Sequence, residues 1–253
     1  MAELDRRYGQ GRAAGRADAG AIDQGLRSYM LRVYNYMAVG VAITGVVAYL
    51  IYSMAVVNDA DGALVGLTAF GSFLYNTAFK WVVLFAPLGL VFFISARINS
   101  MSLITAQISF WAFSALMGAS ISSIFLIYAG QSITQVFFIT AAAFGSLSLW
   151  GYTTKRDISA WGSFLFMGLI GIIIAMVVNL FLGSSALQFA ISVIGVLVFA
   201  GLTAYDTQQI KEMYSANDDH TMAGRKAVMG ALRLYLDFIN MFMMLLSLFG
   251  GRR

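Results

Sequence analysis

The sequence predicts an all-α integral membrane protein, a bundle of seven transmembrane helices. Three observations favour this fold class. Hydrophobic residues make up 60% of the 253 residues and charged residues only 11%, against about 25% charged residues in a soluble domain. The mean hydropathy is +0.78. The apolar residues are gathered in separate stretches, each close to the roughly 20 residues that a helix needs to cross a bilayer.

In chain order, these stretches predict spans at about residues 33–57, 81–97, 102–128, 133–152, 159–182, 186–210 and 229–249. The connections between them are short, except over residues 58–80 and 211–228. The start of the chain is rich in Arg, Gly and Ala and has no apolar core. We therefore expect a disordered, Arg-rich cytoplasmic tail over residues 1–30 and a single transmembrane domain over residues 31–253.

The orientation follows from the Lys and Arg residues. If the N-terminus is cytoplasmic, all of them except Lys80, Arg252 and Arg253 lie on the inside or in the cytoplasmic tail. The positive-inside rule therefore predicts a cytoplasmic N-terminus. Because Arg252 and Arg253 then end on the outside, a re-entrant last segment stays open beside a full span.

Two aspartates lie inside the last two predicted spans. Asp206 comes five residues before Lys211, and Asp237 comes four residues after Arg233. At 1.5 Å per residue, each carboxylate lies about 6–8 Å from a cytoplasmic charge, so we expect both at one depth. An ionisable group in hydrocarbon costs several kcal/mol unless it is paired or wetted, which makes both residues candidates for function.

Arg97 ends the second predicted span at the same level. Two carboxylates in a low-dielectric site cannot both ionise cheaply, so they titrate as a unit, and an arginine can bridge them. We therefore expect Asp206, Asp237 and Arg97 to form a pH sensor or gate. The two aspartates are also candidate Ca2+ ligands, because Ca2+ prefers carboxylate and carbonyl oxygens. Simpler interpretations are interfacial anchoring and an ordinary ion pair between Arg233 and Asp237.

Both stretches that contain these aspartates resemble motifs of the transmembrane Bax inhibitor motif family, the Bax inhibitor-1-like proteins. The resemblance lies in Tyr205–Lys211 and in Ala231–Asn240, which runs on to Leu248–Gly251. It implies a seven-helix bundle in which the other six helices surround the last one. It also implies a bacterial inner-membrane protein that acts as a pH-sensitive calcium leak, with Asp206 and Asp237 as sensor and pore gate.

We therefore expect a calcium or cation leak channel or transporter rather than an enzyme, with no cofactor and Ca2+ as the transported ion. Its expected partners are the lipid bilayer, Ca2+ and H+, and no nucleic acid. One alternative is a non-transporting adaptor that modulates a membrane-anchored AAA protease. Another alternative is an intramembrane aspartyl protease. The sequence around the second aspartate of such enzymes resembles Gly-x-Gly-Asp, whereas this chain has Leu234-Tyr-Leu-Asp237.

Overall fold

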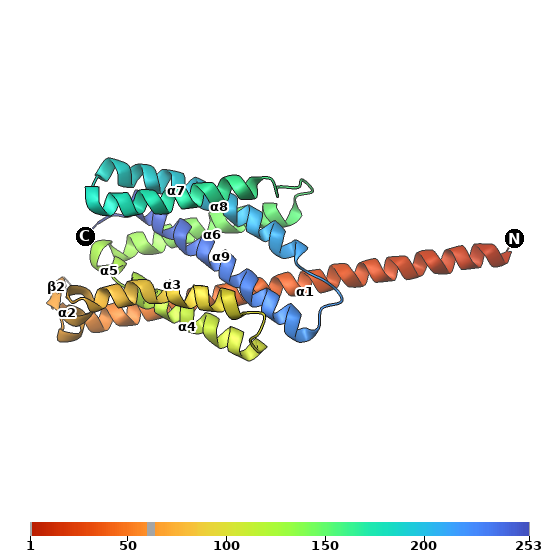
Figure 1. The fold of residues 1–253 in the computed structure, drawn as a ribbon, viewed down its shortest axis with the longest axis horizontal. Coiled ribbons are helices and arrows are strands. Elements are labelled where there is room, and N and C mark those ends of the chain that lie inside the picture. The colour runs from red at the N-terminus through yellow and green to blue at the C-terminus, as the bar shows by residue number, and fades with distance from the viewer. Residues whose placement is uncertain (1, 60–63, 253) are drawn as a thin grey trace.

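The computed structural model describes residues 2–59 and 64–252, and the backbone alone over residues 2–23. Within this part of the chain, seven helical segments are long and apolar enough to cross a membrane. This confirms the predicted fold class (Figure 1). The segments are Gln24–Ala55 of α1 (Ala2–Ala55), α3 (Phe79–Arg97), Leu103–Ile127 with α4 (Leu103–Ile121) and α5 (Ile124–Ile127), α6 (Gly130–Thr153), α7 (Trp161–Leu182), α8 (Ser185–Glu212) and α9 (His220–Phe249).

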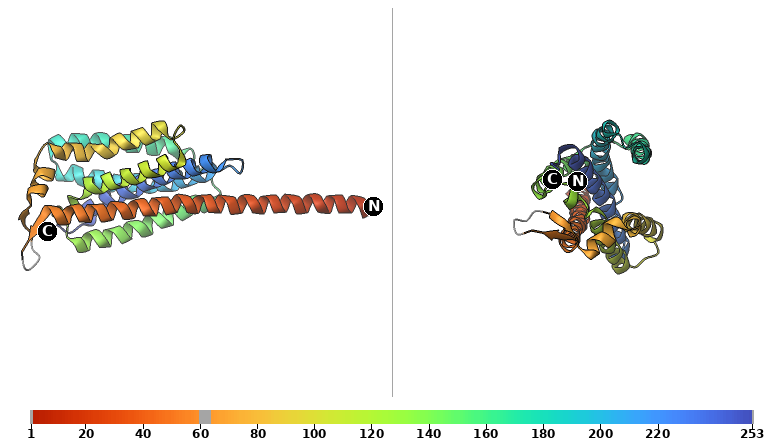
Figure 2. Two further views of the ribbon diagram at one scale, coloured as in Figure 1. Left: turned by 90° about the horizontal axis from the view of Figure 1, so that it is seen from below. Right: turned by 90° about the vertical axis from the view of Figure 1, so that its left-hand side faces the viewer.

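The long connection after the first span contains regular structure that the sequence did not predict. The strands β1 (Val56–Asn58) and β2 (Leu64–Leu67) pair antiparallel. The short helix α2 (Ala69–Asn76) follows, and the hydroxyl of Thr68 caps it by accepting a hydrogen bond from the Gly71 amide. These elements lie at the end of the bundle opposite to the N-terminus (Figure 2).

The N-terminal part of α1 extends alone beyond the bundle (Figures 1 and 2). Here the structure differs from the sequence-based expectation of a disordered tail, because a single helix runs from Ala2 through the first span. Ala and Arg rank among the better helix formers, and they are frequent in this segment.

The last helix, α9, is the most enclosed of the seven. In its most apolar 18-residue stretch 61% is buried, against 11–33% in the other spans. It packs on α1, α4, α6 and α8, whereas α3 packs mainly on α4, and α7 packs on α8. Four helices, rather than six, therefore make the main contacts with α9.

The helix α9 crosses the whole bundle, so that the C-terminus lies at the opposite end from the N-terminus (Figure 1). There the Ala129 amide donates a hydrogen bond to the Gly251 carbonyl, and the Gly251 amide donates to the Ser132 hydroxyl. This arrangement favours a full last span over a re-entrant segment.

Small residues let the helices around α9 approach one another closely. A Cβ at Gly118 on α4 would lie 2.6 Å from the Thr44 carbonyl oxygen on α1. A Cβ at Gly151 on α6 would lie 2.4 Å from the Ala204 carbonyl oxygen on α8. Such backbone contact is typical of helix packing in membranes, where burial of apolar surface does not drive association.

Candidate functional site

Asp206 on α8 and Asp237 on α9 face each other in the interior of the bundle. Their carboxyl groups lie within hydrogen-bonding reach of each other. Asp237 is buried, with 4% of its surface exposed, and Asp206 is half-buried. The structure thus brings together the two aspartates that stand out in the sequence.

The proximity of these carboxyl groups makes it costly for both to be ionised at once. Among the described residues, no N–H or hydroxyl group donates a hydrogen bond to the buried Oδ2 atom of Asp237. An ionised carboxylate has no hydrogen to donate, so a hydrogen bond between two carboxyl groups forms only when one of them is protonated. Two such groups in a low-dielectric interior titrate together rather than independently. The pair can therefore hold one proton between two side chains.

The arginine near this pair is Arg233. It lies one turn before Asp237 on α9 and acts electrostatically on both carboxyl groups. Its side chain is exposed, and it lies one turn closer than Asp237 to the end of α9 that is connected to α8. A cation there offsets the single negative charge of a pair that shares one proton.

Arg97 lies elsewhere. It is the exposed last residue of α3, a helix that packs on α2 and α4. Within the described part of the chain, no ion pair is formed by Arg97. The structure does not join Arg97 to the aspartates, and a gating role for this residue stays a prediction from the sequence.

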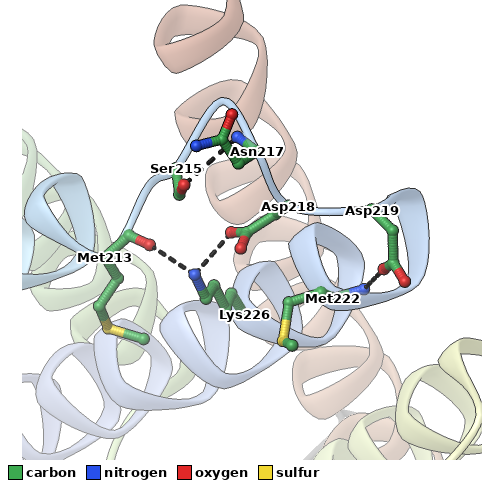
Figure 3. Close-up of polar contacts among 7 residues, drawn as sticks. All are labelled: Met213, Ser215, Asn217, Asp218, Asp219, Met222 and Lys226. Atoms are coloured by element: carbon green, nitrogen blue, oxygen red, sulfur yellow. Dashed lines mark hydrogen bonds and ion pairs between the residues drawn. The ribbon is translucent and has the colours of Figure 1, made fainter.

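The loop between α8 and α9 fixes how the two helices lie side by side. The Lys226 ammonium donates a hydrogen bond to the Met213 carbonyl at 3.0 Å and forms an ion pair with Asp218 at 2.5 Å (Figure 3). Asp219 caps α9 by accepting a hydrogen bond from the Met222 amide. These contacts tie the end of α8 to the start of α9, and they thereby set the spacing of the helices that carry the two aspartates.

A chain of hydroxyl groups begins next to Asp206 and joins three helices. The Thr207 hydroxyl donates to the Thr203 carbonyl at 2.7 Å. It also contacts the Ser148 hydroxyl on α6 at 2.8 Å, and Ser148 contacts the Tyr34 hydroxyl on α1 at 2.7 Å. Because Thr207 uses its hydrogen on Thr203, Ser148 donates to Thr207, and Tyr34 donates to Ser148. The chain therefore has a fixed direction and holds α1, α6 and α8 together.

Two more polar residues of the same stretch of α8 fasten the connection between α6 and α7. The Gln208 side chain accepts a hydrogen bond from the Ile158 amide and donates one to the Arg156 carbonyl. The Lys211 ammonium donates a hydrogen bond to the Tyr152 carbonyl at 2.9 Å and lies 5.3 Å from the centre of the Tyr152 ring. Most polar residues of this stretch thus position α8, and Asp206 is the one that faces α9.

Tyr235, half a turn before Asp237, anchors α9 against α1 and α4. It is fully buried, and its hydroxyl hydrogen-bonds with the Thr44 hydroxyl at 2.6 Å. Thr44 in turn donates to the Ser114 carbonyl at 2.9 Å. The Tyr235 ring meets Phe113 and Phe110 edge to face, with centroids 5.3 and 5.9 Å apart.

The hydroxyl groups of Tyr34, Thr44, Ser148 and Tyr235 were not predicted from the sequence as part of the site. A lone Ser or Thr in an apolar helix usually bonds to a carbonyl of its own helix, so its position carries little signal. Tyr235 had one signal, since it lies in the stretch that carries the family resemblance.

The described residues contain no group of three or more His, Cys, Asp or Glu side chains that could hold a metal ion. Any cation at this site would therefore be bound by the two carboxylates together with carbonyl, hydroxyl or water oxygens, which suits a hard ion such as Ca2+.

Comparison with known proteins places this bundle in a family. The family described as "Inhibitor of apoptosis-promoting Bax1" matches residues 26–253. The chain belongs to this Bax inhibitor-1-like family. The match begins just after the N-terminal extension and includes both aspartates, so it covers the whole bundle.

Bacterial relatives of the family align along nearly the full chain. Inner membrane protein YbhL of Escherichia coli (strain K12) is 44% identical over 231 residues, which cover 90% of this chain and 94% of YbhL. A protein of Caulobacter vibrioides is 45% identical over 264 residues that cover both chains completely. A protein of Rickettsia prowazekii is 46% identical over 231 residues, covering 91% of this chain and 92% of that protein. Together with the seven apolar spans, the similarity to inner membrane protein YbhL supports a multi-pass protein of a bacterial inner membrane.

Proposed function

We propose that this protein is a pH-sensitive leak channel or transporter for Ca2+ or a similar cation, gated by the Asp206–Asp237 pair. The observation that carries the proposal is the contact between two carboxyl groups in the interior of an apolar bundle, one of them buried, within reach of Arg233. A structural role alone would not require two ionisable groups at this depth, where each costs several kcal/mol.

The proposed gate opens when the pair of carboxyl groups takes up a second proton. With one shared proton, the pair carries a single negative charge that attracts Arg233 and holds α8 against α9. A second proton, taken up as the pH falls, removes this charge and with it the attraction to Arg233. The contact between the helices then loosens, so we expect cation flux to rise on acidification.

The same oxygens serve the ion. When the helices separate, the carboxyl groups of Asp206 and Asp237 are freed from each other and can ligate a divalent cation that displaces their protons. Protons and cations therefore compete for one site. This competition makes the flux depend on both the pH and the cation concentration.

The test is dye-reported Ca2+ flux into liposomes across a range of pH, comparing the wild type with single and double Asn variants. Each single variant, Asp206→Asn or Asp237→Asn, keeps one titratable carboxyl group, so we expect a shifted pH profile. The double variant imitates the fully protonated pair. The pair can then no longer titrate, so we expect the flux of this variant to be independent of pH, and any flux lost relative to the acidic wild type reports the carboxylates as ligands of the cation.

Asp157→Asn is the matched control. Asp157 lies in the exposed connection between α6 and α7, where hydrogen bonds from Ser159 hold the pKa of its carboxyl below the ordinary value. This carboxyl group therefore stays ionised between about pH 5 and pH 8, above its ordinary titration range. Its replacement should leave the pH profile unchanged. A double Asn variant with the pH dependence of the wild type would refute the proposed gate.

A further inference from the structure

A long apolar groove of about 1240 Å³ runs between α1 and α6. Its lining extends from Arg27 to Ala48 on α1 and from Ile133 to Tyr152 on α6. The 22 residues from Arg27 to Ala48 measure about 32 Å as a helix, close to the roughly 30 Å of the hydrocarbon core of a bilayer. Among the lining residues of α9 is Phe238, directly after Asp237. The groove thus opens sideways into the membrane and reaches the helix that carries the buried aspartate.

The groove carries positive charge at one end, where most of its polar lining residues also lie. Arg27 is the one charged residue among its described lining residues, and its side chain is exposed. Tyr152 lies at the same end, and the Lys211 ammonium is held against its ring and carbonyl. The hydrogen bond between Tyr34 and Ser148 lies in the same half of the groove.

The opposite end of the groove is almost wholly apolar. The residues from α1, α4, α5 and α6 at that end include Ala48, Ile121, Ile124, Phe125 and Ile133. The groove therefore has a positively charged end at the level of one membrane surface and an apolar interior. This matches a molecule with an anionic head and apolar chains, because basic pockets between transmembrane helices bind anionic lipid headgroups.

The apolar lining of the groove suits the acyl chains of a lipid, which are thin and flexible and can lie between helices. Gly45 on α1 and Gly145 on α6 widen the groove, since a Cβ at either position would meet open space.

We propose that this groove binds one anionic phospholipid, with its phosphate at Arg27 and its acyl chains along α1, α6 and α9. The site is independent of the proposed cation flux. A bound lipid would pack against Phe238, Ile239 and Phe242 of α9. It would fill the lateral opening through which lipid has access to the last helix.

The test is native mass spectrometry of the full-length protein, titrated with phosphatidylglycerol or with phosphatidylcholine of the same acyl chains. We expect the wild type to retain one phosphatidylglycerol molecule at least several-fold better than phosphatidylcholine. Arg27→Gln should bring the two lipids close to equal retention. Gly145→Leu should lower the retention of both, because its side chain enters the groove.

Two matched variants serve as controls. Arg32→Gln removes a cation from the same helix outside the groove lining, and Gly171→Leu adds the same side chain at an exposed glycine of α7 with open space around it. Both should retain phosphatidylglycerol like the wild type, and thermal unfolding in detergent should show that all four variants are folded.

Equal retention of phosphatidylglycerol by the wild type, Arg27→Gln and Gly145→Leu would overturn the proposal. So would loss of retention in Arg32→Gln to the same extent as in Arg27→Gln, because the preference would then reflect general surface charge. A dimer of the wild type that Gly145→Leu dissociates would also overturn the proposal, because the groove would then be filled by a second copy of the chain.

Discussion

At the scale of single residues, the Tyr235 hydroxyl gives a direct test of how the interior is held. Tyr235→Phe keeps the ring against Phe110 and Phe113 but removes the hydrogen bond to Thr44. We expect a loss of about 0.6–1.7 kcal/mol in the free energy of unfolding, the range for polar contacts between membrane helices. Unfolding in mixed detergent micelles measures it.

Tyr235→Ala gives the contrasting result. It also removes the buried ring and should cost about 3–5 kcal/mol, as for other buried aromatic side chains. Equal stability of Tyr235→Phe and the wild type would show that the hydroxyl contact contributes nothing.

The same scale shows what the sequence could predict of the site. Asp206 and Asp237 were predictable, because a carboxylate inside an apolar stretch is rare and both stretches resemble family motifs. The arginine was predicted less well, because Arg97 was expected to bridge both aspartates and Arg233 was considered only as an ordinary ion-pair partner of Asp237. Distance along a helix gives depth, and Arg97 and Arg233 have similar depth, but only the packing of α3 on α4 and of α9 in the centre decides which one approaches the pair.

At the scale of helices, Ser148 is the link through which α1, α6 and α8 are held together. Ser148→Ala breaks its hydrogen bonds to both Tyr34 and Thr207. We expect a loss of about 1–2 kcal/mol in the free energy of unfolding, since two contacts between helices are lost. Ser146→Ala on the same helix is the control, because the exposed Ser146 bonds only to the carbonyl of Ala142. A similar effect of both substitutions would contradict the account of the hydroxyl chain.

The helices themselves were largely predictable from hydropathy, since a span must bury its backbone polar groups and carry apolar side chains over its full length. The errors lie where this constraint is absent. The helix α9 begins at His220, earlier than expected, because its first turns are polar and the Asp219 cap rather than hydropathy sets the start. The strand pair and α2 were missed, since short elements outside the bilayer have no comparable signal.

At the scale of the whole molecule, the orientation in the membrane stays a prediction from the Lys and Arg distribution. The chain has no cysteine, so single cysteines can report it. We expect Asn58→Cys to react with a membrane-impermeant maleimide in intact cells, and Ala216→Cys to react only after permeabilisation. Both positions are exposed, and they lie in connections at opposite ends of the bundle. Labelling of Ala216→Cys alone in intact cells would reverse the orientation.

The central claim is that Asp206 and Asp237 share one proton at neutral pH. Uptake of a second proton then opens the path for cations. Infrared difference spectroscopy of the protein in lipid tests it most directly, because a protonated carboxyl group has its own C=O stretching band. At neutral pH we expect such a band in the wild type and none at that position in the Asp206→Asn, Asp237→Asn double variant. On acidification the wild-type band should grow over the pH range in which Ca2+ flux rises. Spectra in which wild type and double variant carry the same carboxyl bands at every pH would contradict the claim.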